Sequence, residues 1–172
     1  MRIGVGYDSH RFDDARPLIL GGVEIPDVPG LRGHSDGDAI AHAVTDALLG
    51  AAGLGDIGAL FPDTDPETVG ADSLELLAGA VRRIESENYQ VVNVDVTVVA
   101  EAPAIGPHAR AMRERLAGVL HAPPAAVSIK GKSNEGMGWI GRGEGIAVIA
   151  VVSIDQIGDI DALLASIRSG GG

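Results

Sequence analysis

Three residues in the first quarter of the chain could bind a metal ion. Asp8 and His10 stand two residues apart at the end of an apolar segment, residues 1–8, that reads as a strand, and this spacing places both side chains on one face. His42 lies within the helix predicted over residues 38–52. One carboxylate and two imidazoles make an open three-ligand site, suited to zinc with water or a phosphate oxygen as the fourth ligand.

The spacing alone leaves other interpretations open. Asp-x-His pairs occur often by chance, so Asp8 could simply end a strand while His42 lies on a solvated helix face. A set of two histidines and one carboxylate could equally hold iron in an oxygenase. If His42 is a ligand, Asp38 or Asp46, one turn before and after it on the same helix face, could orient its ring.

The composition narrows the chemistry further. With no cysteine among 172 residues, disulfides and thiolate metal sites are excluded, so any metal must bind to histidine and carboxylate groups. The net charge of −11 argues against a nucleic-acid backbone as a partner. A site for several phosphates in so acidic a protein would need local positive charge from metal ions, helix N-termini and a few placed cations.

The hydropathy favours a globular protein without a membrane partner. Apolar residues make up 45% of the chain, enough for one domain with a buried core. The longest uncharged apolar stretch, residues 146–154, is too short to span a bilayer, and no basic start followed by an apolar run indicates secretion. We therefore expect a cytoplasmic protein.

Strands and helices alternate along the chain, and they must position these groups. Strands are predicted over residues 1–8, 90–100, 127–132 and 145–154, with a hairpin over residues 17–26 about Gly21-Gly22. Helices are predicted over residues 38–52, 72–87, 105–120 and 161–168. The N-cap of the first helix is expected at Asp36 or Ser35, and that of the second at Asp72.

This order fits a two-layer α/β (α+β) sandwich, with one mixed sheet of about four strands and helices on one face. Residues 1–155 should form a single domain, and residues 156–172 a partly disordered C-terminal extension. The strand over residues 91–100 should alternate, with Val92, Val94, Val96 and Val98 on one side and Asn93, Asp95 and Thr97 on the other. Residues 146–154 are apolar on both faces, so another subunit should cover the second face.

Five long stretches carry a family resemblance. They are GVGYDSHRF (residues 4–12), GHSDGDAIAHAVTDALLGAAGLGDIGALFPDTDP (33–66), DSLELL (72–77), NVDVTVVAEAPAIGPH (93–108) and GRGEGIA (141–147). Because they are ordered and collinear from Met1 to about Val152, they are far more specific than any single short motif. On these stretches the chain resembles the 2-C-methyl-D-erythritol 2,4-cyclodiphosphate synthase family.

The resemblance implies a metal-dependent phosphorus–oxygen lyase of the non-mevalonate isoprenoid pathway. Its substrate would be 4-diphosphocytidyl-2-C-methyl-D-erythritol 2-phosphate, whose 2-phosphate attacks the β-phosphorus, closes a ring and expels CMP. A homotrimer with active sites between neighbouring subunits is also implied. One divalent ion per subunit, zinc, manganese or cobalt, would bind the residues matching Asp8, His10 and His42, and magnesium would accompany the diphosphate.

The same resemblance assigns catalytic roles to His34 and Ser133. His34 and Ser35 match the family's phosphate-contacting pair, in which His34 would donate to developing charge. Ser133 stands where the family usually has threonine, so it keeps the hydroxyl donor but loses the stiffness of a β-branched side chain. Glu135 matches the residue that holds magnesium, which keeps several waters and needs few protein carboxylates, and Lys132 lies beside it.

Substrate-binding segments follow from the resemblance too. The loops that hold the ribose and methylerythritol hydroxyls would include Asp56, Ile57, Gly58, Phe61, Pro62, Asp63, Thr64 and Asp65. The cytidine pocket would include Ala100, Glu101, Ala102, Pro103, Ala104, Ile105 and Gly106. Because aromatic residues make up only 3% of the chain, backbone N–H and C=O groups rather than stacked rings should recognise the base.

Trp139 stands where the family commonly has phenylalanine, and with Arg142 it would lie near the trimer axis. An apolar cavity there can hold an isoprenoid diphosphate. The alternative is subunit packing, with Arg142 and Glu144 as an interface ion pair.

Two competing functions would use the same residues. A metal-dependent phosphohydrolase would activate water at the metal and release inorganic phosphate. A trimeric binding protein for isoprenoid diphosphates would keep the metal for structure alone. The set of His34, Ser133 and Glu135 argues against the binding protein, because binding alone needs no such groups around a metal.

Overall fold

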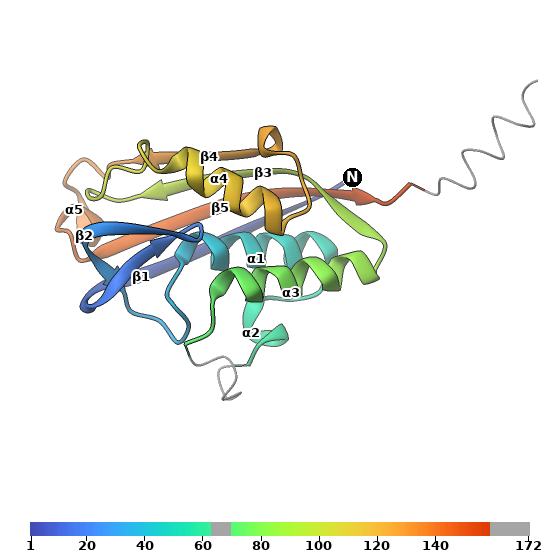
Figure 1. Cartoon of the computed structure of the whole chain (residues 1–172), viewed down its shortest axis with the longest axis horizontal. Coiled ribbons are helices and arrows are strands. Elements are labelled where there is room, and N and C mark those ends of the chain that lie inside the picture. The colour runs from blue at the N-terminus through green and yellow to red at the C-terminus, as the bar shows by residue number, and fades with distance from the viewer. Residues whose placement is uncertain (63–69, 159–172) are drawn as a thin grey trace, which may run out of the picture.

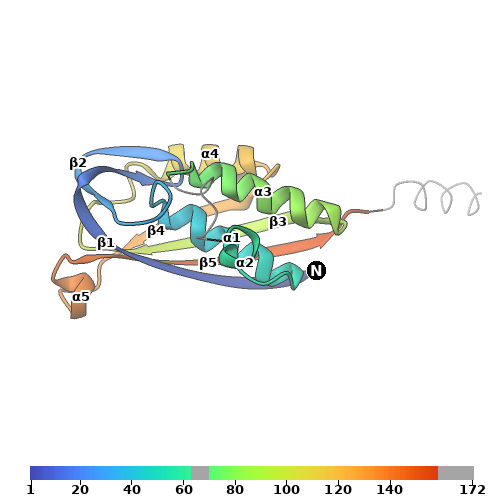
Figure 2. The same ribbon diagram turned by 90° about the horizontal axis from the view of Figure 1, so that it is seen from below.

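The computed structural model describes residues 1–62 and 70–158, which form one five-stranded sheet with its longer helices on one side (Figure 1, Figure 2). The strands are β1 (Arg2–Leu20), β2 (Val23–Leu31), β3 (Tyr89–Val99), β4 (Val127–Lys132) and β5 (Gly145–Gln156). The helices are α1 (Ala39–Ala52), α2 (Ile57–Leu60), α3 (Ser73–Ser86), α4 (Ala109–Val119), α5 (Gly138–Gly141) and the 3₁₀ turn η2 (Pro124–Ala126). The predicted helix over residues 161–168 and the binding residues Asp63, Thr64 and Asp65 lie outside the described residues.

The sheet confirms the predicted mixed two-layer architecture. Its strand order is β2-β1-β5-β3-β4, and β3 pairs with β4 in parallel while the other neighbours are antiparallel. The sheet has five strands rather than about four, because the hairpin adds β2 beside β1. That hairpin turns at Gly21 and Gly22 as predicted, and their φ angles of +56° and +71° suit glycine, which has no Cβ to clash.

Two helix starts differ from the prediction. The cap of α1 is Asp38, whose side chain accepts the N–H groups of Ile40 and Ala41, so neither Asp36 nor Ser35 is the N-cap. The helix predicted from residue 105 begins only at Ala109; Pro107 disfavours helical geometry in Gly106, and residues 106–108 form a turn. The cap of α3 is Asp72, as predicted.

Close packing of α1 on β1 places the candidate site. A Cβ on Gly4 would lie 2.0 Å from the carbonyl oxygen of Ala47, and one on Gly6 would lie 1.9 Å from that of Ala43. These two glycines therefore let the helix backbone rest directly on the strand. Side chains alternate along a strand, so the next residues on the same face are Asp8 and His10.

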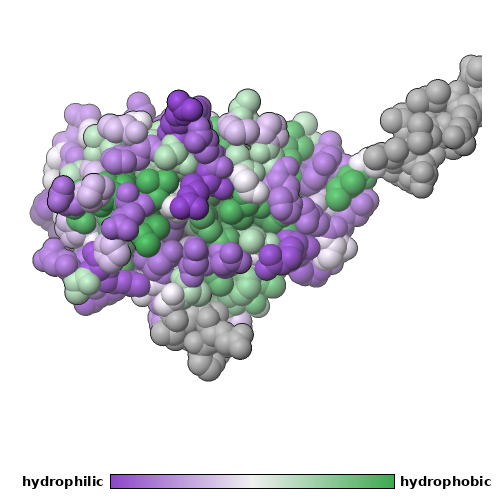
Figure 3. Space-filling view, in the orientation of Figure 1, coloured by the Kyte–Doolittle hydropathy of each residue, from purple (hydrophilic) through white to green (hydrophobic). Residues whose placement is uncertain are grey.

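The two faces of the sheet differ in what covers them. On the helix side β3 and β5 bury Val94, Val96, Val98, Ile146, Val148, Ala150, Val152 and Ile154. On the other face, apolar side chains are exposed: Ile3 (65%), Val5 (66%), Tyr7 (56%), Ile149 (43%) and Val151 (38%). The helix side shows mostly hydrophilic residues to solvent, with hydrophobic ones between them (Figure 3).

Val92 does not follow the predicted alternation. It is 42% exposed, whereas Val94 is fully buried. The pairing of β3 with β5 shifts register between Val91 and Asn93, and such a bulge breaks the period-two pattern of a strand.

Candidate metal centre and active site

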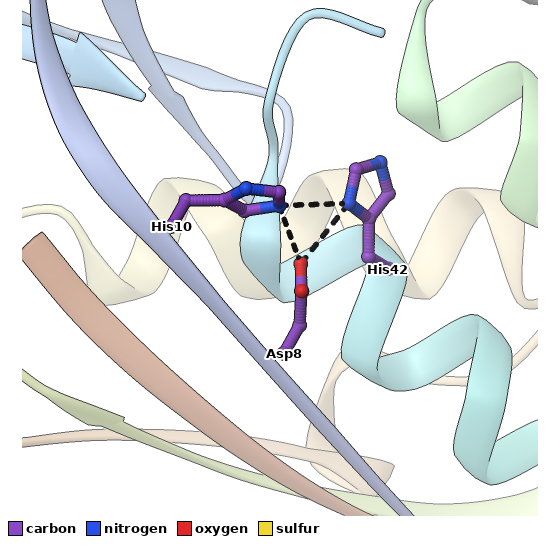
Figure 4. Close-up of side chains that lie close together, drawn as sticks. All are labelled: Asp8, His10 and His42. Carbon is purple, nitrogen blue, oxygen red and sulfur yellow. Dashed lines mark hydrogen bonds and ion pairs between the residues drawn. The ribbon is translucent and has the colours of Figure 1, made fainter. Parts of the chain in front are cut away.

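The three predicted metal ligands meet at one point (Figure 4). The Oδ2 atom of Asp8 lies 2.8 Å from Nε2 of His10 and 3.0 Å from Nδ1 of His42, and the two ring nitrogens are 3.3 Å apart. Strand β1 supplies the first two residues and helix α1 the third. The structure thus brings together the residues that the sequence spacing paired.

This donor set fits a divalent cation of the zinc type. One carboxylate oxygen and two imidazole nitrogens point at a common centre, and all three residues are partly buried. In tetrahedral zinc with bonds near 2.0–2.1 Å, ligand atoms lie about 3.3 Å from one another. The measured spacings of 2.8, 3.0 and 3.3 Å are close to that geometry.

The charges at this centre also suit a cation. Burial alone would raise the pKa of Asp8, but hydrogen bonds from His10 and His42 outweigh it and lower the pKa to about 2. Burial opposes a charged His42, yet the hydrogen bond and the negative charge of Asp8 raise its pKa above the ordinary value. Asp8 is therefore an ionised ligand at neutral pH.

Two serines, rather than Asp38 or Asp46, hold the far side of the His42 ring. Nε2 of His42 lies 2.9 Å from Oγ of Ser35 and 3.0 Å from Oγ of Ser73. Ser35 was expected to contact phosphate, and in the structure its hydroxyl faces His42. Ser73 was not expected from the sequence, in which it appears only as the residue after the helix cap Asp72.

Asp38 is occupied elsewhere. Its carboxylate is fully buried and accepts the N–H groups of Gly21, Gly22, Ile40 and Ala41 at 2.7–3.1 Å. Burial raises its pKa to about 6 in spite of these donors, so the carboxylate is ionised at neutral pH. Asp38 thereby joins the hairpin turn to the start of the helix that carries His42.

Asp46 has a different contact as well. It accepts the N–H of Ile57 at 2.8 Å, and burial raises its pKa. This bond holds the start of α2 against α1. The predicted hydroxyl-binding residue Asp56 is the N-cap of α2 and accepts the N–H of Ala59 at 2.8 Å.

A cavity of about 490 Å³ opens beside the metal ligands. It is lined by His10, Arg32, Gly33, His34, Ser35, His42, Ile57, Gly58, Phe61 and Leu76. The predicted residues His34, Ser35, Ile57, Gly58 and Phe61 therefore share one cavity with two of the three metal ligands. Pro62 follows at the end of the first described range.

Two arginines of this region were not singled out from the sequence. Arg32 lines the cavity and adds a cation beside His34. Arg16 donates hydrogen bonds to the carbonyl oxygens of Leu31, Gly33 and Ser35. It fixes the backbone of the loop that carries the predicted phosphate-contacting pair.

The predicted magnesium region lies elsewhere in the chain. Oγ of Ser133 donates to Oε1 of Glu135 at 2.9 Å, and both side chains are accessible. Glu101, expected in the cytidine pocket, accepts the N–H groups of Asn134 and Gly136 at 2.9 and 3.1 Å. Its carboxylate therefore holds the Ser133–Gly136 loop in place. Lys132, at the end of β4, is exposed.

The predicted cytidine segment lies beside this loop. The N–H of Ala100 bonds to the carbonyl oxygen of Lys132 at 2.9 Å, and Ile105 is buried against Gly131. The side chain of Ile105 thus belongs to the core and leaves only its backbone for a ligand. The remaining predicted residues Ala102, Pro103, Ala104 and Gly106 lie in the same connection between β3 and α4.

Trp139 and Arg142 lie at α5. Trp139 lines a hollow of about 320 Å³ with Ser9, His10, Arg11 and Glu144. Nε of Arg142 donates to Glu144 at 2.7 Å, and Arg11 lies 3.4 Å from the same carboxylate. The Arg142–Glu144 ion pair is therefore formed within one chain.

Comparison with known proteins gives a consistent result. The family model described as the YgbB family matches residues 1–155. A relative from Gemmatimonas aurantiaca, named 2-C-methyl-D-erythritol 2,4-cyclodiphosphate synthase, is 58% identical over 158 residues, which are 92% of this chain and 95% of the relative.

Among the described residues, the structure has no helix long and apolar enough to cross a membrane.

Solved structures that resemble this chain point to the same family. A structure of 2C-methyl-D-erythritol-2,4-cyclodiphosphate synthase in a CDP-bound form has a TM-score of 0.82 and 41% identity, covering 90% of this chain and all of that one. The bifunctional IspDF from Campylobacter jejuni has a TM-score of 0.87 and 42% identity, and this chain covers 42% of its length.

Proposed function

The chain belongs to the YgbB family, and on this premise we propose that it acts as a 2-C-methyl-D-erythritol 2,4-cyclodiphosphate synthase. It converts 4-diphosphocytidyl-2-C-methyl-D-erythritol 2-phosphate into the 2,4-cyclodiphosphate and CMP. The observation that carries this proposal is the 58% identity to a synthase of that name across 92% of the chain. The cavity beside Asp8, His10 and His42 supports it.

The reaction asks the protein chiefly for positioning. The 2-phosphate oxygen forms a bond to the β-phosphorus while the bond from that phosphorus to the oxygen of CMP breaks. Attacking and leaving oxygens must lie in line, and the charge on the equatorial oxygens must be neutralised. Both reacting groups belong to one molecule, so holding it folded can supply roughly 7–11 kcal/mol in favourable cases.

Each group near the cavity has a task in this reaction. His34, exposed at the cavity, donates a hydrogen bond to phosphate oxygens, and Arg32 adds positive charge. The carboxylate of Asp56 and the backbone at Gly58 orient the hydroxyls of the methylerythritol and ribose. Phe61 and Leu76 form an apolar wall that excludes water from the folded substrate.

Two cations would complete the charge balance. Asp8, His10 and His42 would hold a divalent ion of the zinc type, which when bound neutralises charge on the phosphate oxygens. Glu135, with Ser133 donating to it, would hold magnesium against the diphosphate, since magnesium needs few protein ligands. The segment from Ala100 to Gly106 would offer its backbone groups to the cytosine.

We place the complete site between subunits of a homotrimer. Strands β5 and β3 separate β1 from β4, so at about 4.8 Å per strand the strand bearing Asp8 lies about 14 Å from the one that leads to Glu135. One diphosphate is too short to touch both within a single chain. The exposed apolar side chains of Val5, Tyr7 and Ile149 on the bare face offer the surface through which neighbours associate.

Phosphorus NMR tests the activity. Purified protein with substrate, magnesium and zinc should yield CMP and a cyclic diphosphate. Inorganic phosphate would instead indicate the hydrolase, and no turnover by trimeric, metal-loaded protein would overturn the enzymatic proposal. His42→Ala should abolish the reaction, while His121→Ala, at an exposed histidine paired with Glu85, is the matched control and should retain it.

A further inference from the structure

The ring of His42 is held at both nitrogens. Nδ1 faces Asp8 at 3.0 Å and His10 at 3.3 Å, on the side where a cation would bind. Nε2 faces the hydroxyls of Ser35 and Ser73 at 2.9 and 3.0 Å. A neutral imidazole donates from one nitrogen and accepts at the other, so the partners at Nε2 decide which nitrogen can offer its lone pair to a cation.

Ser73 is the partner whose hydroxyl proton already has an acceptor. Its side chain is fully buried, and its hydroxyl makes a short hydrogen bond to Oδ1 of Asp36. Oδ2 of Asp36 accepts the backbone N–H of Ser73 at 3.2 Å. An ionised carboxylate can only accept, so the hydroxyl proton of Ser73 points at Asp36. The oxygen of Ser73 is left to accept a proton from Nε2 of His42.

The position of Ser73 is fixed by the backbone around it. It is the first residue of α3, directly after the N-cap Asp72. Asp36 donates its N–H to the carbonyl oxygen of Ala71 at 3.1 Å and accepts the N–H of Asp38 at 3.1 Å. The loop that carries Asp36, the start of α1 and the start of α3 are thus joined at one point behind His42.

Ser35 lies as close to the ring, but among the described residues it has no carboxylate behind it. Its Oγ is 2.9 Å from Oγ of Ser73 and 3.3 Å from the N–H of Gly37. Its proton can turn to Nε2 of His42, to Oγ of Ser73 or to the cavity that it lines. The two serines therefore differ in a way that an experiment can separate.

We propose that Ser73, with the charge of Asp36 behind it, is the positioning residue that holds His42 with its proton on Nε2 and its Nδ1 lone pair toward the cation. The inference rests on the proposed function, because it assigns the support of the same metal centre. Partners that orient a ligating histidine typically change metal affinity by about 10- to 100-fold when they are removed. Ser73 matters to the reaction through His42 and needs no contact with the substrate.

Metal affinity gives the first test. Zinc or cobalt binding to the purified protein is measured by competition with a chromogenic chelator, in the absence of substrate. Ser73→Ala should weaken binding about 10- to 100-fold, and Ser35→Ala should weaken it less. Ser86→Ala, at the exposed end of the same helix, is the matched control and should bind as the unmodified chain does.

Asp36→Asn keeps the volume of the side chain and removes its charge, so it tests the same chain of hydrogen bonds from the other end. It too should weaken binding, and the double variant Asp36→Asn/Ser73→Ala should bind no more weakly than Ser73→Ala alone. Additive losses would show that the two residues act separately and would overturn the proposal. Thermal unfolding of each variant verifies that it is folded.

The second test reads the tautomer of the loaded protein. In zinc-loaded protein labelled with ¹⁵N-histidine, NMR should show zinc at Nδ1 of His42, the nitrogen that faces Asp8, and the proton on Nε2, the nitrogen that faces Ser73. In Ser73→Ala this proton loses an acceptor and should exchange with water faster. Zinc at Nε2 in the unmodified chain, or a Ser73→Ala variant with unchanged proton exchange and affinity, would contradict the inference. An unmodified chain that binds no zinc would instead overturn the proposed metal centre.

Discussion

The two halves of the candidate site are built differently. In the metal half, the side chains of Asp8, His10 and His42 are only 21%, 18% and 14% exposed, and they contact one another. In the loop half, Ser133 and Glu135 are accessible and contact each other across a loop held by Glu101. One chain supplies all three residues of the metal half, whereas the side chains of the loop half face solvent.

The difference follows from what each half must do. A zinc-type centre needs three ligand atoms at fixed distances, so its ligands come from a strand and a helix that pack directly on one another through Gly4 and Gly6. Magnesium keeps several of its waters and tolerates a single carboxylate on a loop. Rigid packing supports the demanding centre, and a loop suffices for the other.

The largest effect is expected in the metal half. Asp8→Ala removes the ionised ligand and leaves two histidines, so cation binding should be lost and turnover should fall at least about 10³-fold, since charge neutralisation by a metal contributes several kcal/mol. Asp155→Ala, at an exposed carboxylate that pairs with the N-terminus, is the control. Turnover within tenfold of the unmodified chain would show that the metal half is not catalytic.

Removal of the carboxylate in the loop half should separate turnover from first-cation binding. Glu135→Gln keeps the shape of the side chain but loses its charge, and turnover should fall about 10²-fold, as for loss of one electrostatic stabiliser. Zinc affinity should not change, because Glu135 belongs to the other half. A parallel loss of zinc affinity would mean that both residues bind the same ion.

Zinc should raise the unfolding temperature of the protein through the metal half alone. At a free zinc concentration about 100 times the dissociation constant, binding adds about 2.7 kcal/mol to the free energy of unfolding. The unfolding midpoint should therefore rise by roughly 5–10 °C when zinc is added to chelated protein. Glu135→Gln should show the same rise and His10→Ala none, which differential scanning calorimetry can measure.

The smallest effect is expected at the loop anchor. Glu101→Ala frees the N–H groups of Asn134 and Gly136, and the magnesium concentration for half-maximal turnover should rise a few-fold, because each exposed hydrogen bond contributes only about 1 kcal/mol. Glu101→Gln retains an acceptor oxygen and should lie between Ala and the unmodified chain. A Glu101→Ala variant with altered cytidine affinity but unchanged magnesium dependence would return Glu101 to the nucleotide pocket.

The sequence allowed the metal half to be predicted better than its support. Alternation in a strand pairs Asp8 with His10, but spacing alone left the role of His42 open, and the family resemblance joined it to the other two. The bond from His42 to Ser73 joins residues 31 positions apart through a loop, and no local pattern encodes it. The cap at Asp38 was missed because its choice depends on Gly21 and Gly22, in a distant hairpin that donates to the same carboxylate.

In the sheet, too, local patterns predicted some features, and contacts with distant residues determined the others. Alternating valines predicted the buried face of β3, but a bulge before Asn93 exposed Val92, and single-strand periodicity cannot reveal a bulge set by the partner strand. The late start of α4 could have been predicted from Pro107. The apolar outer face of β5 was predicted, and the exposed Ile149 and Val151 confirm that this chain alone leaves it bare.

The central claim is that neighbouring subunits contribute the two halves of one site, and subunit mixing tests it most directly. His42→Ala and Glu135→Gln chains, each expected to keep at most about a hundredth of the turnover alone, are co-expressed in equal amounts and purified as mixed oligomers. If each site joins the metal half of one chain to the loop half of the next, about a quarter of the interfaces in random trimers carry both intact halves. Turnover should then recover to about a quarter of that of the unmodified chain, whereas mixed oligomers as inactive as the parents would show that both halves of a site come from one chain.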